Sequence, residues 1–285
     1  GPSSYDRITA AHSRGFLQSS EGSAPQQPVS VAGGAVFIGA SRAKLVFAKF
    51  DFVAERIEIQ DFTTYARPML RKEAMQLAWQ NDPHHVLWVR LGDGTLAAVT
   101  LRPDQEVIGW HRHALPGAFV ENICCIRSAD NRRDELYVQT RRVIDGVTRR
   151  YIERLEPFFE AENLDAPTLK GAWFVDCGIT YSGAATDVLT GLDHLEGQTV
   201  RVVCPAGDLG LFTVTSGAVT LPRQVSEAVV GLSVSFRTKS LPLDIQVASG
   251  STRPARKRAA HVTVLLHESA GGEVSCNDAT PEPIT

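Results

Sequence analysis

Residues 86–113 read VLWVRLGDGTLAAVTLRPDQEVIGWHRH, and this stretch decides the fold. It contains three short apolar runs, at residues 86–91, 95–101 and 107–113. Gly92-Asp93-Gly94 separates the first two runs, and glycine takes the positive φ of a tight turn at little cost. Arg102-Pro103-Asp104 separates the second run from the third, because proline presets φ and aspartate bonds its own backbone. Short runs joined by tight turns predict an antiparallel meander rather than a β-α-β unit.

The same spacing continues on both sides of the meander. Further strands are expected at residues 33–39, 44–51, 74–80, 119–126, 135–142 and 147–155. The clearest departure is residues 53–71, where Asp61 is expected to cap a short helix over residues 63–70, interrupted by Pro68. The pattern predicts a mainly β protein whose antiparallel sheets resemble the blades of a β-propeller, here a partial one.

A second series of short strands predicts a separate module in the C-terminal half. These strands are expected at residues 173–179, 200–204, 211–215, 218–221 and 229–237, with a small polar connection at 183–191. Strands this short and regular are expected to close into a small β-barrel, which removes exposed edges. An acidic stretch, residues 157–167, precedes the module and marks the expected domain junction.

The expected domain organisation has four parts. They are an N-terminal linker or remnant of an upstream blade (1–32), propeller-like blades with a short helical excursion (33–166), the inserted small barrel (167–245), and a returning strand with a C-terminal tail (246–285). The returning strand is expected over residues 260–268.

Composition and charge exclude some function classes. The formal net charge is −3 over 285 residues, which is not the global basic signature of a nucleic-acid-binding protein. Five cysteines without a C-x-x-C motif predict buried free thiols rather than a zinc site or a disulfide framework: Cys124, Cys125, Cys177, Cys204 and Cys276. No apolar run has the length needed to cross a bilayer, and no signal peptide is visible.

Candidate catalytic and metal-binding groups are all explained better by structural roles. His111 and His113 share one face of a predicted strand, but no carboxylate or cysteine joins them at a metal-ligand spacing, so hydrogen bonding and aromatic stacking are expected. Three carboxylate pairs lie in turns or beside arginines and are expected to form surface salt bridges: Asp104/Glu106, Asp134/Glu135 and Glu153/Glu156. No Gly-x-Ser-x-Gly motif is present. We therefore expect no enzymatic activity, no cofactor and no metal.

Two basic clusters are the remaining candidates for binding. One cluster flanks the expected Asp145-Gly146 turn and contains Arg141, Arg142, Arg149 and Arg150; the other contains Arg253, Arg256, Lys257 and Arg258. Either the clusters are solvated or ion-paired with Glu153 and Glu156, or they form a subunit interface or the wall of a DNA conduit. No aromatic residues are interleaved with these arginines, which disfavours a platform for stacking single-stranded bases.

The order of the elements resembles the tail tubular, or nozzle, proteins of short-tailed phages and their prophage relatives. The residues that carry the resemblance are DGTL and GWHRH in the meander, DELY at 134–137, RRVIDGVTRRYIERLE at 141–156, and GLDHLEGQTV at 191–200. The resemblance extends from about Gly33 to Gly272. The later module is similar to the small β-barrel first named in ubiquitin-activating enzymes, a likeness of fold that implies no ubiquitin chemistry.

This resemblance implies a structural component of a phage or prophage tail. Such a protein forms a ring with other copies of itself (six copies in the family), attaches to the head–tail adaptor and to tail fibre proteins, and contacts double-stranded DNA transiently during ejection. It implies a location in the virion tail after synthesis in the bacterial host cytoplasm, without contact with a membrane.

The alternative is a β-rich carbohydrate-binding or carbohydrate-cleaving module that recognises a host surface. It would require exposed tryptophans over a groove with two carboxyl groups. All four tryptophans lie in predicted strands, where core positions are expected: Trp79, Trp88, Trp110 and Trp173.

Overall fold

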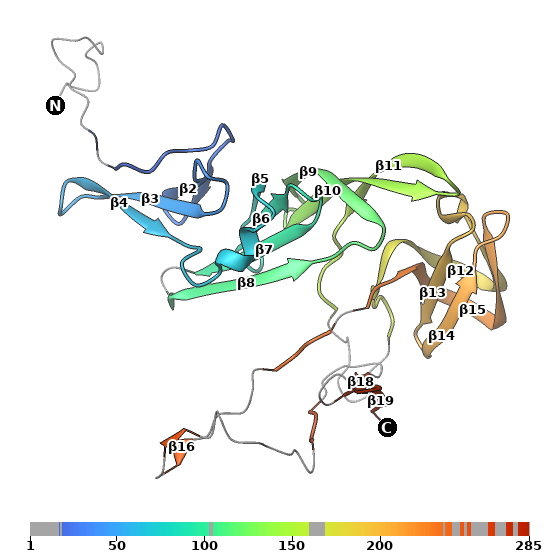
Figure 1. The fold of residues 1–285 in the computed structure, drawn as a ribbon. Coiled ribbons are helices and arrows are strands. Elements are labelled where there is room, and N and C mark those ends of the chain that lie inside the picture. Colours follow the sequence, from blue (N-terminus) through green and yellow to red (C-terminus); the bar gives the residue numbers. More distant parts are fainter. Residues whose placement is uncertain are drawn as a thin grey trace. The chain divides into compact units, whose positions relative to one another are not determined.

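The computed structural model confirms a mainly β chain made of small antiparallel sheets (Figure 1). It describes residues 17, 19–102, 105–159, 169–235, 237–240, 246–247, 250–251, 262–265, 272–275 and 279–284. The chain divides into two compact units, Gly1–Glu156 and Pro157–Thr285. Within the described residues no closed barrel and no closed propeller is detected.

The first unit is a succession of three antiparallel meanders. The first sheet contains β1 (Val29–Val31), β2 (Gly34–Ile38), β3 (Leu45–Asp51) and β4 (Arg56–Asp61); the second contains β5 (Ala74–Gln80), β6 (Val86–Leu91), β7 (Leu96–Arg102) and β8 (Val107–His113); the third contains β9 (Ala118–Arg127), β10 (Asp134–Ile144) and β11 (Val147–Arg154). In each sheet, strands that are consecutive in sequence are neighbours in space. The three runs expected in residues 86–113 are confirmed as β6, β7 and β8.

The second sheet is the middle layer of the first unit, and its central strands β6 and β7 are buried on both faces. Leu87, Val89 and Val99 pack with the first sheet in one apolar cluster. Trp88 and Ala98 point the other way and pack with the third sheet in a second cluster. Side chains alternate between the two faces of a strand, so burial of both faces requires apolar residues at nearly every position. This is why β6 and β7 read as continuous apolar runs.

Turn geometry follows the glycine positions. Gly94 has φ 78° in the β6–β7 turn, and a Cβ there would lie 2.4 Å from the ring of Phe119. The Val120 N–H donates to the Gly94 carbonyl at 2.9 Å, so this turn also connects the second sheet to β9. Asp145 and Gly146, with φ 49° and 71°, form the predicted tight turn between β10 and β11.

The prediction of a short helix in the N-terminal part is wrong. Residues 56–61 form β4, and residues 63–70 contain only a 3₁₀ turn, η1 (Arg67–Leu70), with Pro68 in its first positions. The Asp61 carboxylate accepts from the Thr63 N–H at 2.8 Å, which closes a local turn instead of capping an α-helix. Residues 29–31 form β1, an edge strand of the first sheet, where Val31 is buried and Val29 packs against the core.

The second unit is organised around two long strands rather than many short ones. Its four-stranded sheet has the order β12-β15-β13-β14, with β12 (Val175–Thr190), β13 (Thr199–Cys204), β14 (Gly207–Thr213) and β15 (Ala218–Ser233). The prediction of uniformly short strands is wrong, because β12 and β15 each span 16 residues. Register shifts along this pair let β12 continue through the small polar stretch expected to be a connection. No ladder among the described residues joins β14 back to β12.

The remaining described elements are short, and they bear on few of the other predictions. A 3₁₀ turn, η3 (Asp193–Leu195), follows β12, and two short hairpins pair β16 (Gln246–Val247) with β17 (Gly250–Ser251) and β18 (Glu273–Val274) with β19 (Glu282–Pro283). Of the expected strand over 260–268, only residues 262–265 are described, and they are not in a strand. The predicted domain limits at residues 32, 166 and 245 remain predictions.

The cysteines are free but mostly not buried. Of the four that the structure describes, Cys204 is buried, Cys125 and Cys177 are half-buried, and Cys124 is exposed. The prediction of buried thiols is therefore wrong for Cys124, because β9 turns that side chain to the outer face of the third sheet. In the part of the chain that the structure describes, no helix combines the length and hydropathy that a membrane span requires.

Candidate interaction sites

The hairpin of β10 and β11 carries the first predicted basic cluster. Arg141 lies opposite Arg150, and Arg142 lies opposite Arg149, so each face of the hairpin carries two arginines, one per strand. Even-numbered residues of β10 face the core, which places Arg142 inside and Arg141 outside. The other cluster, Arg253, Arg256, Lys257 and Arg258, lies outside the described residues.

On the inner face, Arg142 is buried and forms a complete ion pair. Its Nε and one terminal nitrogen donate to the two carboxylate oxygens of Glu153 at 2.9 Å each. The other terminal nitrogen donates to the Pro116 carbonyl at 2.6 Å, and the Thr140 hydroxyl donates to Glu153 at 2.5 Å. A two-pronged contact of this kind fixes both side chains, because the guanidinium and carboxylate planes must match.

On the outer face, Glu121 binds two arginines at once. Arg150 donates to both of its oxygens, at 2.7 and 3.2 Å, and Arg141 Nε lies 3.3 Å away. Arg141 also stacks over the Phe119 ring, 4.8 Å from its centroid. The hydrogen bond from Arg150, followed by the charges of Arg150 and Arg141, holds the pKa of the Glu121 carboxyl below its usual value. Three of the four hairpin arginines are thus ion-paired within the third sheet, two of them to the same carboxylate.

A β-bulge explains how Glu121 reaches these arginines. Gln139 pairs with Asn122, but the next residue, Thr140, pairs with Val120, so Glu121 is the extra residue of β9. A bulge re-aims the side chain of the extra residue. The sequence places Glu121 about twenty residues before the hairpin, and strand patterning alone does not predict the bulge. Arg149 is exposed and has no ion pair or hydrogen bond among the described residues.

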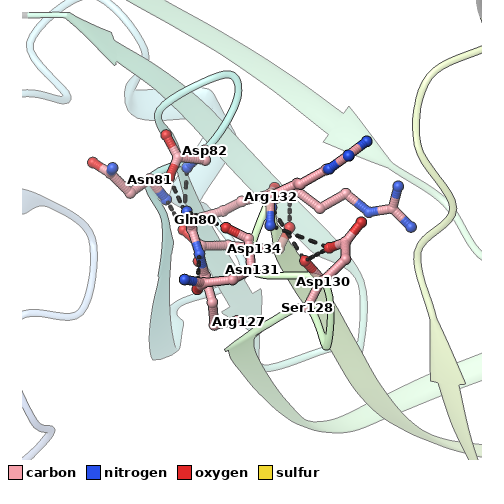
Figure 2. Close-up of polar contacts among 10 residues, drawn as sticks. Gln80, Asn81, Asp82, Arg127, Ser128, Asp130, Asn131, Arg132 and Asp134 are labelled. Carbon is pink, nitrogen blue, oxygen red and sulfur yellow. Dashed lines mark hydrogen bonds and ion pairs between the residues drawn. The ribbon is translucent and has the colours of Figure 1, made fainter.

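A second polar network connects the turn after β5 to the turn between β9 and β10 (Figure 2). Arg127 forms ion pairs with Asp82 and, at 3.2 Å, with Asp134. The Asp134 carboxylate also accepts from the backbone N–H groups of Asn81 and Asp82, at 2.8 and 3.1 Å. Burial opposes ionisation of Asp134, but the Asp82 N–H and Arg127 outweigh it and hold its pKa below the usual value. The network therefore holds the second and third sheets together at the end where these two turns lie.

The loop between β9 and β10 is also fixed by its own polar side chains (Figure 2). Ser128 donates to Asp130 at 2.6 Å and accepts from the Arg133 N–H at 3.1 Å. Asp130 accepts from the Arg132 N–H at 3.1 Å, and Asn131 accepts twice from Arg127. This arrangement satisfies the loop internally and gives it a structural role.

The histidine pair on β8 has the predicted structural role. The Nδ1 atom of His111 lies 2.6 Å from Nε2 of His113, so one ring carries the hydrogen and the other accepts it. Both rings contact Trp88, with ring centroids 6.2 and 4.8 Å from it. Burial, aided by His111, lowers the pKa of His113 to about 4. The His113 ring is therefore neutral at pH 7, and burial also lowers the pKa of His111.

Among the described residues, the carboxylate side chains form no catalytic or metal-binding arrangement. Glu135 pairs with Arg133 and Arg154, and Arg154 also pairs with Glu156, as the salt-bridge interpretation expects. Asp104 lies outside the described residues. No group of three or more His, Cys, Asp or Glu side chains in the described part of the chain is placed to hold a metal ion.

The tryptophans do not form an exposed stacking surface. Trp88 is 1% exposed, and Trp79 and Trp110 pack against the core of the first unit. The Trp110 indole donates to the Phe62 carbonyl at 3.0 Å. Trp173 is half-buried and precedes β12, so its predicted strand position is wrong. A carbohydrate platform needs exposed aromatic faces, and these four residues do not supply one.

Comparison with known proteins adds no assignment: neither a scan against protein-family models nor a search of curated proteins gives a match for this chain.

Replacing Arg142 with alanine is expected to destabilise the first unit by about 3–5 kcal/mol, because Glu153 loses its partner in a buried site. Arg149→Ala is the matched control across the same ladder, and it should change stability by less than about 0.5 kcal/mol because Arg149 is exposed. Urea unfolding followed by tryptophan fluorescence measures both. The combination Arg142→Met with Glu153→Leu should recover much of the loss. Equal stability of the two single variants would contradict this assignment.

Acidification from pH 6.5 towards pH 4 is expected to destabilise the first unit through His113. Its pKa is lower in the folded than in the unfolded chain, so the unfolded state binds more protons in this window and stability falls as pH falls. The loss should be on the order of 2 kcal/mol between pH 7 and pH 4.5. His113→Phe should flatten this dependence in urea unfolding. An unchanged slope in the variant would refute the role of His113.

Proposed function

We propose that the chain is a structural subunit of a phage or prophage tail, part of a nozzle ring that attaches to a head–tail adaptor and conducts DNA during ejection. The observation that carries the proposal is the succession of three antiparallel meanders in the first unit, in the order of the sequence elements that resemble nozzle proteins. In this proposal the three sheets are propeller-like blades, and the sheet of the second unit belongs to an inserted barrel-type module.

The charge arrangement of the third sheet supports a conduit or assembly role. Most of its arginines are bound by carboxylates of the same sheet, so few remain to hold phosphate groups. Strong binding of DNA depends on many unpaired cations, because each phosphate contact releases counterions. A passage for sliding DNA should bind it weakly, and a sheet whose arginines are mostly ion-paired meets that requirement.

Negative-stain microscopy and mass photometry of the purified chain test this proposal. The expected result is closed rings with a single copy number. Duplex DNA should bind weakly, with an affinity that falls only gently as salt is raised, because few phosphates are contacted. A chain that stays monomeric at tens of micromolar, or that retains immobilised glycans in preference to assembling, would contradict it.

A further inference from the structure

The first sheet has an outer face made mostly of apolar side chains, with Ser30 opposite Ala35 and Asp61 opposite Val46 as polar members. Val46 on this face is already buried, at 1% exposed. The register places Ala35 opposite Ala48 and Ala48 opposite Ile59, while Phe37 lies opposite Val46 and Phe50 opposite Ile57. The alternate residues, such as Leu45 and Phe47, point into the core shared with the second sheet. We call the first set the outer face of the first sheet: Ala35, Phe37, Val46, Ala48, Phe50, Ile57 and Ile59.

This face does not have the composition of a surface that remains in water. An antiparallel sheet with one solvated face normally alternates apolar and polar residues. Here Phe50 and Ile57 are 46% and 39% exposed, and Phe52, at the tip of the same hairpin, is 85% exposed. Contiguous exposed apolar side chains on a folded unit mark a surface that another molecule covers.

The third sheet offers an outer face whose charged side chains are mostly ion-paired, with one positive charge in excess because Glu121 is shared by two arginines. Its exposed apolar residues are Ile126, Val143 and Ile152. The charged side chains between them are already paired within the sheet, with Glu121 holding Arg141 and Arg150. Burying a charge costs most free energy when the charge has no partner. A face whose charges are already ion-paired can therefore be covered by a second molecule at a lower cost in free energy.

Local charges favour contact between these two different faces. The β3–β4 hairpin carries Asp51, Glu55, Glu58 and Asp61 against Lys49 and Arg56, an excess of two negative charges. The β10–β11 hairpin carries five arginines, Arg154 included, against Asp134, Glu135, Asp145 and Glu153, an excess of one positive charge. Two copies joined by identical hairpins would bring like charges together, whereas unlike hairpins attract.

We infer that the outer face of the first sheet of one copy packs on the outer face of the third sheet of a second copy. This contact would repeat between copies the sheet-on-sheet packing that the first unit uses twice within itself. Two different faces make a head-to-tail contact, which closes into a ring when the rotation permits. The inference deepens the proposed function by naming the two surfaces through which neighbouring copies in the ring touch. It rests on the proposed function only for the closure of these contacts into a ring.

An exposed native thiol provides a direct test by cross-linking. Cys124 lies on the outer face of the third sheet, and Ile57→Cys would add a thiol to the outer face of the first. Mild oxidation of the Ile57→Cys variant should give a ladder of linked copies on a non-reducing gel, and adding Cys124→Ser should abolish it. Leu211→Cys, a more exposed position in the second unit (56% against 39% for Ile57), is the control and should give no such ladder. Dimers that persist after Cys124→Ser, or the absence of any ladder, would overturn the inference.

A mixing experiment separates failure of this inference from failure of the proposed function. Ile57→Lys and Ile152→Lys should each prevent assembly alone, but an equal mixture should form heterodimers, because each variant keeps one intact face. Leu211→Lys should assemble like the unmodified chain. Rings that persist in both lysine variants would refute the contact and leave the ring proposal standing. Head-to-tail cross-links without any closed ring would refute the nozzle and leave the contact standing.

Discussion

Burial of the central strands of the second sheet on both faces is the constraint on which the first unit depends. β6 and β7 contribute to two separate apolar clusters, one towards the first sheet and one towards the third. Neither outer sheet has a second layer of its own among the described residues, so each is stabilised mainly through this shared middle layer. Fully burying one large apolar side chain contributes about 1.5–3 kcal/mol, and these two strands supply many such side chains.

The charged side chains of the third sheet are stabilised by ion pairs with other side chains of the same sheet. A buried guanidinium is tolerated only when its hydrogen-bonding groups are satisfied, and Arg142 meets this condition through Glu153 and Pro116. The bulge at Glu121 does the same for the outer face. Arginines that look like a binding cluster in the sequence are thus largely part of the architecture. The exception on this hairpin is Arg149, beside the turn.

The sequence predicts the parts of the fold that local chemistry determines. The strands of residues 86–113 and the Asp145-Gly146 turn were predictable, because continuous apolar runs and turn residues act over a few positions. The length of β12 was not predictable, since the small residues Gly183-Ala184-Ala185 give no strand signal and are held in the strand by the pairing of β12 with β15. The ion-pair partner of Arg150, Glu121, was not predictable either, because a bulge on another strand, β9, determines it.

Amide hydrogen exchange tests the central claim most directly. If the second sheet is the shared core, the backbone amides of β6 and β7 should exchange most slowly in the first unit, opening only with its global unfolding. The amides of β4 and β11, which are edge strands, should exchange faster through local opening. Exchange in β6 and β7 as fast as in β4 and β11 would contradict the account, because the middle layer would then not hold the unit together.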